Sequence, residues 1–319
     1  MGRAALKLWG EGVVPVFGDR FEAGELVGMI AEPGPHGGRW RRGRWAVEAL
    51  HDRFPSQSRA VRFAAVQDEA GGLLWANPVA LTLLCRDKLA CQRVLEAAGV
   101  AGLPPVVSGN GDLEDVLDEW GQGFLKPRNG ALGVGVRHVQ AGEVLPRSLP
   151  SVVPGAEDAV VLQAAVDPGP LWAGRALRVL CQRDRSGAWV QCPAVLRRSR
   201  RDRVVNVARG AEVRPAEDCL SVETLTAVAL ACDAVCAALT AAPGCGRAVE
   251  LGVDVVLDGD DRPWVIEVNG RPRGRLAVLA AQAPDRFGAV HGAAVARPIV
   301  TTAAWARAGV GEDGPGQPG

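Results

Sequence analysis

Several features are missing from this 319-residue chain, and each absence removes a class of protein. Basic and acidic side chains balance at 36 each, so no excess of one sign predicts a nucleic-acid or membrane-surface partner. We find no apolar run of membrane-spanning length, and no basic-then-apolar secretory signal at the N-terminus. The eight cysteines include no Cys-x-x-Cys pair, which favours reduced thiols over a zinc site or a disulfide framework. We therefore expect a cytoplasmic protein with a small-molecule partner.

What is present fits an enzyme-sized globular protein. Hydrophobic residues make up 48% of the chain, enough for a full core, and the length suits two or three compact units. Segment 37–45 is basic and aromatic, as in some single-strand nucleic-acid binders. No second basic patch or known binding motif accompanies it, so a solvated loop is the favoured interpretation and no nucleic-acid partner is expected.

The stretch 250–269 has the strongest local pattern and predicts a β-hairpin. Two apolar runs, 253–257 and 264–268, flank the turn-forming sequence Asp-Gly-Asp-Asp-Arg-Pro. Asp254 and Glu267 are equidistant from the centre of this turn. We therefore expect them to be cross-strand neighbours.

The same hairpin is a candidate metal site. Because residues two apart in a strand share a face, Glu267 and Asn269 should point to the side of Asp254, whereas Ile266 and Val268 should point into a core. Converging oxygen-bearing side chains are costly to bury unless a cation lies between them, and Mg²⁺ takes oxygen ligands. The alternative is an edge hairpin whose polar face is in water and binds no metal. The hairpin alone does not decide between the two.

A second informative stretch, 124–139, predicts a strand that ends in Lys126 and continues through a glycine-rich loop into another strand. Glycines at 130, 133 and 135 would let backbone N–H groups approach phosphates, and Lys126 would add a point charge. The loop is neither a Walker A sequence nor a Rossmann fingerprint. By itself it equally suits a mobile β-hairpin loop.

Taken in order, these segments resemble the ATP-grasp superfamily over about residues 75–275. Within it, the chain looks most like the YheC/YheD-type branch, described as endospore-coat-associated, and is also similar to glutathione synthetase and RimK-type ligases. The segments that carry the resemblance are Asn77-Pro78, Asp87-Lys88, Lys126-Pro127 with its glycine loop, the strand 160–163, Leu177-Arg178-Val179, Asn206-Val-Ala-Arg209-Gly210, and Asp254 with Glu267-Val-Asn269.

The resemblance implies a role for each matching position. Lys88 and Lys126 would hold the α- and β-phosphates of ATP, and the loop 129–135 would close over the triphosphate. The implied nucleotide contacts are Lys88, Lys126, Asn129, Gly130, Gly133, Gly135, the adenine hinge Gln163, Ala164 and Val166, and Asp167 at the ribose. The implied metal ligands are Asp254, Glu267 and Asn269, for one or two Mg²⁺ or Mn²⁺ ions. The implied contacts to the γ-phosphate and acceptor are Arg178, Asn206 and Arg209.

Two departures from the family pattern affect the implied contacts to adenine and to the acceptor substrate. Gln163 and Ala164 stand where many relatives have acidic hinge residues, and Asn269 is followed by Gly-Arg-Pro-Arg-Gly-Arg instead of the commoner Ser-Pro-Gly. The arginine-rich run 197–203 could gather an anionic substrate, although a solvated loop between strands is favoured.

The resemblance implies an α+β, ATP-grasp architecture. We expect an N-terminal α/β domain at 1–86, an ATP-binding subdomain at 87–166, a grasp subdomain with the magnesium site at 167–300, and a disordered tail at 301–319.

The implied activity is ATP-dependent carboxylate–amine or carboxylate–thiol ligation through an acyl phosphate, on a small carboxylate-bearing or peptide-like substrate. Two alternatives stay open: a phosphotransferase with the same ATP site, and a non-catalytic nucleotide-binding component of a spore or envelope assembly. No membrane partner is expected, and the sequence leaves open whether the protein is a homodimer.

Overall fold

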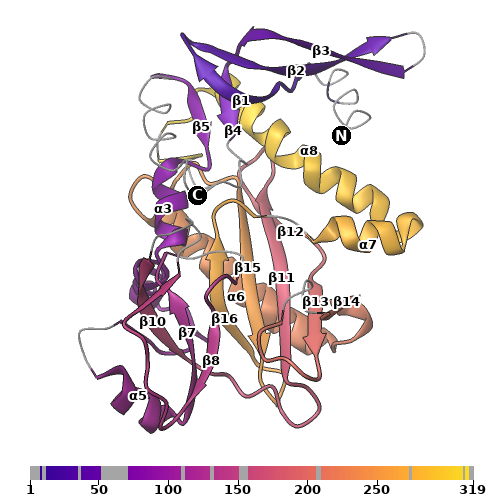
Figure 1. Ribbon diagram of the computed structural model, residues 1–319. Helices are drawn as coiled ribbons and strands as arrows, with labels where there is room; N and C mark the ends of the chain where they lie inside the picture. Colours follow the sequence, from indigo (N-terminus) through magenta and orange to yellow (C-terminus); the bar gives the residue numbers. More distant parts are fainter. Residues whose placement is uncertain are drawn as a thin grey trace.

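The computed structural model of the chain describes residues 8, 12–34, 37–51, 71–108, 112–129, 133–150, 157–205, 210–272, 275–311 and 313–315. Four sheets organise these residues, and Figure 1 shows them following one another along the chain. The sheet nearest the N-terminus is an antiparallel meander, followed by a short parallel pair. The strands of these two sheets are β1 (Phe17–Glu22), β2 (Glu25–Gly34), β3 (Gly37–Ala46), β4 (Ala49–His51) and β5 (Leu74–Ala76).

A five-stranded sheet, here called the middle sheet, has the strand order β6-β10-β7-β8, with β9 paired to β10. Its strands are β6 (Val106–Ser108), β7 (Gln122–Pro127), β8 (Arg137–Gln140), β9 (Ser148–Pro150) and β10 (Glu157–Ala164). Helix α5 (Leu113–Trp120) covers this sheet because Leu113 and Leu117, four residues apart, point to the same side and pack on Leu125 and Leu162. Helices α3 (Val79–Arg86) and α4 (Lys88–Ala97) precede the sheet in the chain.

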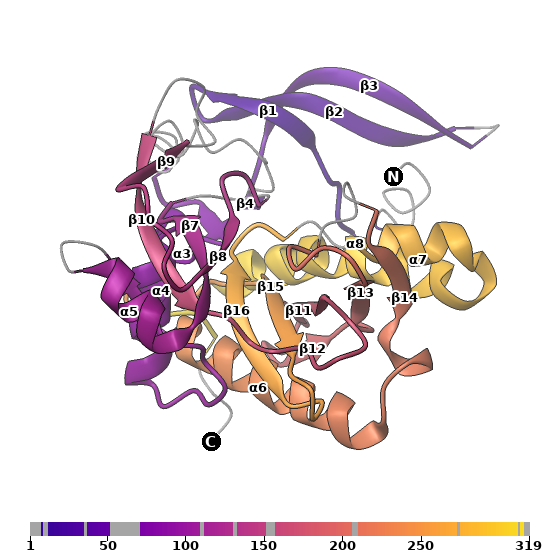
Figure 2. The same ribbon diagram turned by 60° about the horizontal axis from the view of Figure 1, so that its bottom comes forward.

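A six-stranded sheet, here called the large sheet, has the order β14-β13-β11-β15-β16, with β12 paired to β11. Its strands are β11 (Gly174–Arg183), β12 (Trp189–Gln191), β13 (Val195–Ser199), β14 (Glu212–Pro215), β15 (Glu250–Leu257) and β16 (Pro263–Asn269). Helix α6 (Val222–Ala241) packs on one face of the sheet, while α7 (Leu276–Gln282) and α8 (Pro284–Ala308) pack on the other (Figure 2). The sheet is thus covered on both sides, and the largest cluster of buried apolar side chains among the described residues lies on its α6 side.

The predicted hairpin is confirmed, including its register: β15 pairs with β16, and Asp254 lies opposite Glu267. The prediction that Ile266 points into the core is wrong. The register shifts by one residue directly after Asp254, and this bulge reverses the alternation of side chains along β16. As a result Val265 and Val268 are both buried in the core, and Ile266 is half-buried at the edge of a pocket.

Helix α6 begins later than its apolar pattern suggests. The sequence favours a start near Glu217, but residues 216–218 form a separate 3₁₀ turn (η3, Ala216–Asp218), and α6 begins after Ser221. The Ser221 hydroxyl caps the helix by accepting a hydrogen bond from the Thr224 N–H at 3.1 Å. By length and composition α6 could also cross a membrane, contrary to our reading of the sequence, and 39% of its most apolar window is buried in this fold. Cys232 and Cys236 lie on its buried side, as expected of core thiols.

Three further features differ from the sequence-based expectations. Helix α3 falls in the expected N-terminal α/β domain, yet it packs against β16 of the large sheet. The described part of that domain before α3 consists mainly of strands. Helix α8 continues through residues 301–308, where a disordered tail was expected, because Thr301 and Trp305 bury one side of its last turns.

Candidate functional site

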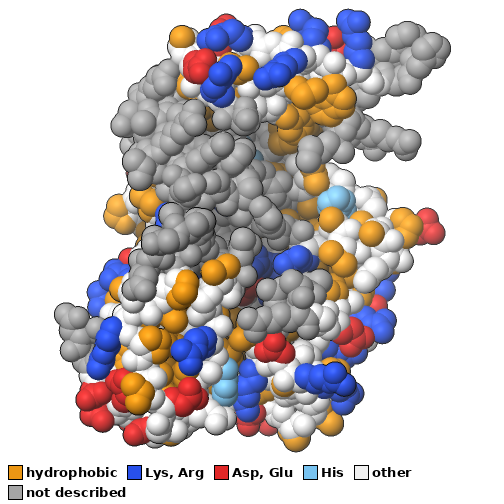
Figure 3. All heavy atoms as spheres, viewed as in Figure 1, with side chains coloured by type: hydrophobic (Ala, Val, Ile, Leu, Met, Phe, Trp, Pro, Cys, Tyr) orange, Lys and Arg blue, Asp and Glu red, His pale blue; other side chains and the backbone are white. Residues whose placement is uncertain are grey.

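A pocket lies between the middle and large sheets, where β7 and β10 face β16 and α4. Its apolar wall includes Leu95, Val106, Val161, Val265 and Ile266. Its polar wall has Lys88, Gln92, Lys126, Gln163 and Glu267. In Figure 3, a few Lys and Arg side chains are visible near the middle of the molecule, where its lower left and lower right parts meet. An apolar slot with a few charged groups is the usual form of a small-molecule site.

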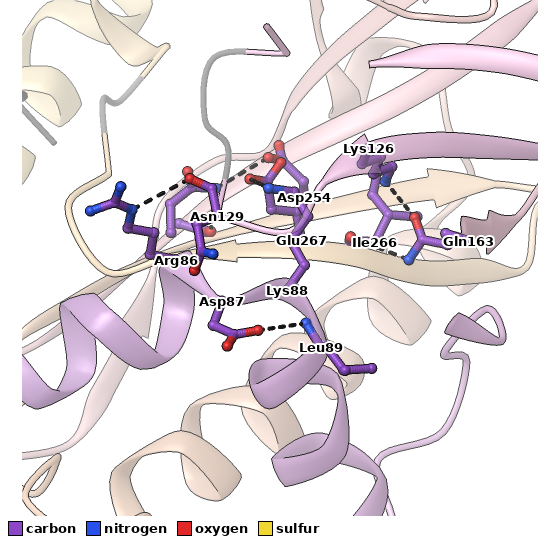
Figure 4. Close-up of polar contacts among 12 residues, drawn as sticks. Arg86, Asp87, Lys88, Leu89, Lys126, Asn129, Gln163, Asp254, Ile266 and Glu267 are labelled. Atoms are coloured by element: carbon purple, nitrogen blue, oxygen red, sulfur yellow. Dashed lines mark hydrogen bonds and ion pairs between the residues drawn. The ribbon is translucent and has the colours of Figure 1, made fainter. Parts of the chain in front are cut away.

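Lys126, near the end of β7, is the central cation of this pocket. Its side chain is only 7% exposed, and its Nζ donates a 2.5 Å hydrogen bond to Oε1 of Gln163 on β10. Gln163 is itself held by a 3.4 Å bond from its Nε2 to the Ile266 carbonyl oxygen (Figure 4). Burial lowers the pKa of Lys126 to about 8, with Lys88 adding to the effect and Glu267 opposing it. Among the described residues Lys126 therefore has a neutral partner and no carboxylate in ion-pair contact.

Lys88 enters the pocket from the first residue of α4. Its Nζ lies 4.0 Å from Oε1 of Glu267. The helix start is fixed by Asp87, which accepts bonds from the N–H groups of Leu89 and Ala90 at 3.1 and 3.0 Å. Arg128, just after β7, holds the same carboxylate through three contacts of 2.7–3.0 Å. The pKa of Asp87 stays below its usual value because these bonds outweigh the effect of burial.

Asp254 forms a second charged centre beside the pocket, on the same face of the large sheet as Glu267. Arg178, its cross-strand partner on β11, grips the carboxylate with two guanidinium nitrogens, Nε at 2.6 Å from Oδ1 and Nη2 against Oδ2. Arg197 on β13 adds a bond of 2.9 Å from Nη2 to Oδ1, and Asn269 donates from Nδ2 at 3.3 Å. Burial favours the neutral acid, yet the arginines hold the pKa of Asp254 below its usual value. Asp254 is thus a fully compensated buried anion.

Comparison with known proteins agrees with this arrangement of two sheets around a cationic pocket. Residues 159–286 match the family model for the YheC/D-like ATP-grasp domain. The chain therefore has the ATP-grasp fold, with its match to this family model confined to residues 159–286. No curated protein matches its sequence significantly.

Solved structures share the ATP-grasp fold with this chain. D-alanine–D-alanine ligase from Coxiella burnetii superposes with a TM-score of 0.57 at 12% identity, over 88% of this chain and 77% of that one. The ligase of the same name from Bacillus anthracis gives 0.54 at 18% identity, over 77% and 76%. Carboxyaminoimidazole ribonucleotide synthase from Aspergillus clavatus gives 0.51 at 13%, over 68% and 53%. The chain therefore spans only about half the length of some structures that it matches. At these identities the likeness establishes the fold.

The donor set around Asp254 suits a hard cation. Asp254, Glu267 and Asn269 offer carboxylate and amide oxygens from neighbouring strands, the kind of ligand that Mg²⁺ prefers. Among the residues that the structure describes, no group of three or more His, Cys, Asp or Glu side chains is placed to hold a metal. Asn269 and bound phosphates would therefore have to complete the coordination, as is common for Mg²⁺. Glu267 is the more available carboxylate: its side chain is 26% exposed, against 6% for Asp254.

The remaining predicted residues lie in several places. Gly133 and Gly135 follow β7 with φ of 72° and 73°, and a Cβ at Gly135 would come within 2.8 Å of Pro127, so this position requires glycine. The Ala164 N–H bonds within the middle sheet to the Pro105 carbonyl at 2.9 Å. Asp167 is exposed and accepts from the Gly169 N–H at 3.1 Å.

Five more of the predicted site residues flank the glycine loop and the strands or lie outside the described part of the chain. Asn129 accepts a 3.4 Å bond from Arg86 at its carbonyl oxygen, and Val166 is half-buried just beyond β10. Outside the described residues are Gly130, Asn206 and Arg209.

The structure adds two residues that our reading of the sequence did not assign to the site. Arg197 was grouped with a solvated arginine run, but its side chain is 12% exposed and bonds to Asp254. Strand alternation could have identified it, because Arg197 pairs with Ala176, which lies two residues from Arg178 and therefore on the same face. Asn77 is fully buried and bonds to both strands of the hairpin. No local signal in the sequence points to those contacts.

Proposed function

We propose that this protein binds Mg-ATP in the pocket between its middle and large sheets and uses it to join a carboxylate to an amine or thiol. The observation that carries the proposal is Lys126: a buried ammonium group with a neutral partner, in a pocket that Lys88 and Glu267 also line. A buried cation without a counter-charge is costly, and a phosphate group would supply that charge.

Each side chain has a role in this proposal. Lys126 and Lys88 neutralise the α- and β-phosphates, with the loop of Asn129, Gly130, Gly133 and Gly135 above them, while Gln163, Ala164, Val166 and Asp167 border the nucleoside. Asp254, Glu267 and Asn269 would hold Mg²⁺, which when bound neutralises charge on the phosphate oxygens. Arg178, which is bonded to Asp254, would contact the γ-phosphate. We assign the same role to Asn206 and Arg209. The transfer depends on positioning and charge, so no protein nucleophile is needed.

The proposed reaction has two steps, phosphoryl transfer to the carboxylate and displacement of the phosphate by the amine or thiol. A substrate carboxylate oxygen attacks the γ-phosphorus, and the bond to the β-phosphate oxygen breaks to release ADP. An amine or thiol then attacks the acyl carbon of the resulting acyl phosphate, inorganic phosphate leaves, and the nucleophile loses its proton. Arg178 and Arg197, which bond to Asp254 beside the pocket, would stabilise the negative charge on the reacting carboxylate and on the transferred phosphate. The substrate would be a small or peptide-like carboxylic acid, and we place the reaction in the cytosol.

A screen of products tests the proposal. The protein with Mg-ATP is offered amino acids, peptides and dicarboxylates, and ADP, inorganic phosphate and product mass are measured. Equal release of ADP and phosphate with a condensed product supports ligation. ADP with a phosphorylated product instead indicates a phosphotransferase, and ATP binding without turnover across the screen indicates a non-catalytic component.

A variant tests the nucleotide site separately. Glu267→Gln preserves shape and removes one charge from the proposed magnesium ligands. We expect it to lose most of the rise in melting temperature that Mg-ATP gives the parent, since that rise depends on affinity. The control is Glu143→Gln, on an exposed loop after β8. An undiminished shift in Glu267→Gln would contradict the metal site.

A further inference from the structure

Asn77 occupies an unusual position between β5 and α3. It is completely buried, and its φ of 52° lies in the left-handed region, which asparagine tolerates better than most residues. Its backbone N–H donates to the Arg247 carbonyl oxygen at 3.0 Å. A buried polar side chain in a strained conformation persists only where its surroundings hold it strongly.

The Asn77 side chain makes four hydrogen bonds, all to the open end of the β15–β16 hairpin. Oδ1 accepts from the N–H groups of Val249 and Glu250 at 2.7 and 3.1 Å. Nδ2 donates to the carbonyl oxygens of Glu250 and Gly270 at 2.8 and 2.6 Å. One amide thereby uses both of its donors and both acceptor positions. It ties the residue before β15 and the first residue of β15 to the residue that directly follows β16.

These contacts lie just beyond the metal-binding face. The last cross-strand pair of the hairpin joins Gly252 to Asn269, and Gly270 comes next. Asn77 therefore holds the two strand ends together where the backbone ladder has stopped. The geometry of Asn269, and of Glu267 two residues earlier, depends on where these ends are fixed.

The same residue also connects the hairpin to Lys88. Helix α3 starts directly after Asn77-Pro78 and leads into Asp87 and Lys88. The helix backbone packs tightly on Gly270: a Cβ there would lie 3.3 Å from the Leu81 carbonyl oxygen. Asn77 is thus the junction between the segment that carries one phosphate-binding lysine and the strands that carry the proposed magnesium ligands.

We propose that Asn77 is a positioning residue for the Mg-ATP site, setting the placement of Glu267 and Asn269 relative to Lys88 without touching the ligand. The inference rests on the proposed function. A purely structural role predicts that substitution of Asn77 lowers the melting temperature alone. A positioning role predicts that the substitution also raises the Mg²⁺ concentration needed for ATP binding.

The test compares Asn77→Gly and Asn77→Asp with the parent and with Thr301→Val. Glycine accepts the positive φ and removes all four side-chain bonds, whereas aspartate keeps the shape and loses the two donors. Thr301 is a matched control: it is also fully buried, and its hydroxyl donates to the Arg183 carbonyl oxygen at 2.8 Å, far along β11 from Arg178. The Mg²⁺ concentration for half-maximal ATP binding is measured by calorimetry, together with adenosine affinity and melting temperature.

We expect the Asn77 variants to need about 10- to 100-fold more Mg²⁺, as for other residues that orient metal ligands. Adenosine affinity should stay unchanged, and Thr301→Val should lose melting temperature without a change in Mg²⁺ requirement. If the parent shows no Mg²⁺-dependent ATP binding, the proposed function fails and the positioning role fails with it. If the parent binds Mg-ATP and the Asn77→Gly protein titrates like it, only the positioning role is overturned. Should Asn77→Asp not fold, Asn77→Gly decides alone.

Discussion

Two buried charges, Lys126 in the pocket and Asp254 beside it, are compensated in different ways. Asp254 has two guanidinium groups and an amide around it, so its charge is neutralised within the protein. In the described part of the chain, the hydrogen-bond partner of Lys126 is the neutral Gln163 amide, and burial lowers the pKa of the lysine to about 8. A buried charge neutralised within the protein makes the fold depend on its partners, whereas a buried charge without a counter-charge favours binding one from outside. The large sheet thus supplies Asp254, a buried anion whose charge is neutralised by neighbouring side chains. The middle sheet supplies Lys126, a buried cation that is available to bind an anionic ligand.

The largest effect should come from removing the anion of the compensated centre. Asp254→Asn leaves Arg178 and Arg197 buried without their counter-ion, and we expect a loss of about 3 kcal/mol in the free energy of unfolding. Urea denaturation measures it. Asp261→Asn is the control, because Asp261 also pairs with an arginine but is 44% exposed, so its loss should stay below about 1 kcal/mol. Equal losses in the two variants would contradict the contrast between them.

Removing the uncompensated charge should mainly affect binding. Lys126→Met deletes the ammonium group, and we expect ATP affinity to fall about ten- to hundredfold, the worth of a charge-assisted hydrogen bond. Calorimetry measures this loss. Stability at neutral pH should hold level or rise, since the buried charge disappears. An unchanged ATP affinity would remove Lys126 from the site.

The same variant gives a pH signature. The pKa of Lys126 is about 8 in the folded protein and 10.5 for a free lysine, so between these values the unfolded chain binds more protons. The contribution of Lys126 to stability therefore rises with pH through this window. The free energy of unfolding of the parent should increase relative to Lys126→Met from pH 8 to pH 10. A constant difference across that range would show that Lys126 titrates as in the unfolded chain.

The smallest effect should come from giving Lys126 a charged partner, as Asp254 already has. Gln163→Glu gives Lys126 a carboxylate partner, which should raise the pKa of the lysine and keep it charged above pH 8. We expect ATP affinity at pH 7 to fall only a few-fold, because the added negative charge opposes phosphate, and its decline between pH 7 and pH 9 to become shallower. Calorimetry at both pH values checks this. A decline as steep as the parent's would mean that Gln163 does not set the protonation of Lys126.

Much of the site could be predicted from sequence because its signals are local. The register of Asp254 and Glu267 follows from the residue types of one turn and two flanking runs, since a hairpin's pairing is fixed by its loop. The bulge beyond that pair could not be predicted, because an extra residue in one strand depends on packing against the rest of the sheet. The ATP-grasp fold followed from the order of motifs along the chain. The roles of the individual residues in binding and catalysis stay predictions.

The sequence by itself determined which residue types could bind phosphate and metal: two of only three lysines in the chain, and two carboxylates with an amide at strand spacing. Only the tertiary structure decided how these charges are balanced. Arg197 reaches Asp254 from another strand, Gln163 meets Lys126 across the middle sheet, and Asn77 bonds to residues more than 170 positions away. Such contacts depend on which segments pack together, and burial then sets the strength of each charge, so neither can be read from the local sequence.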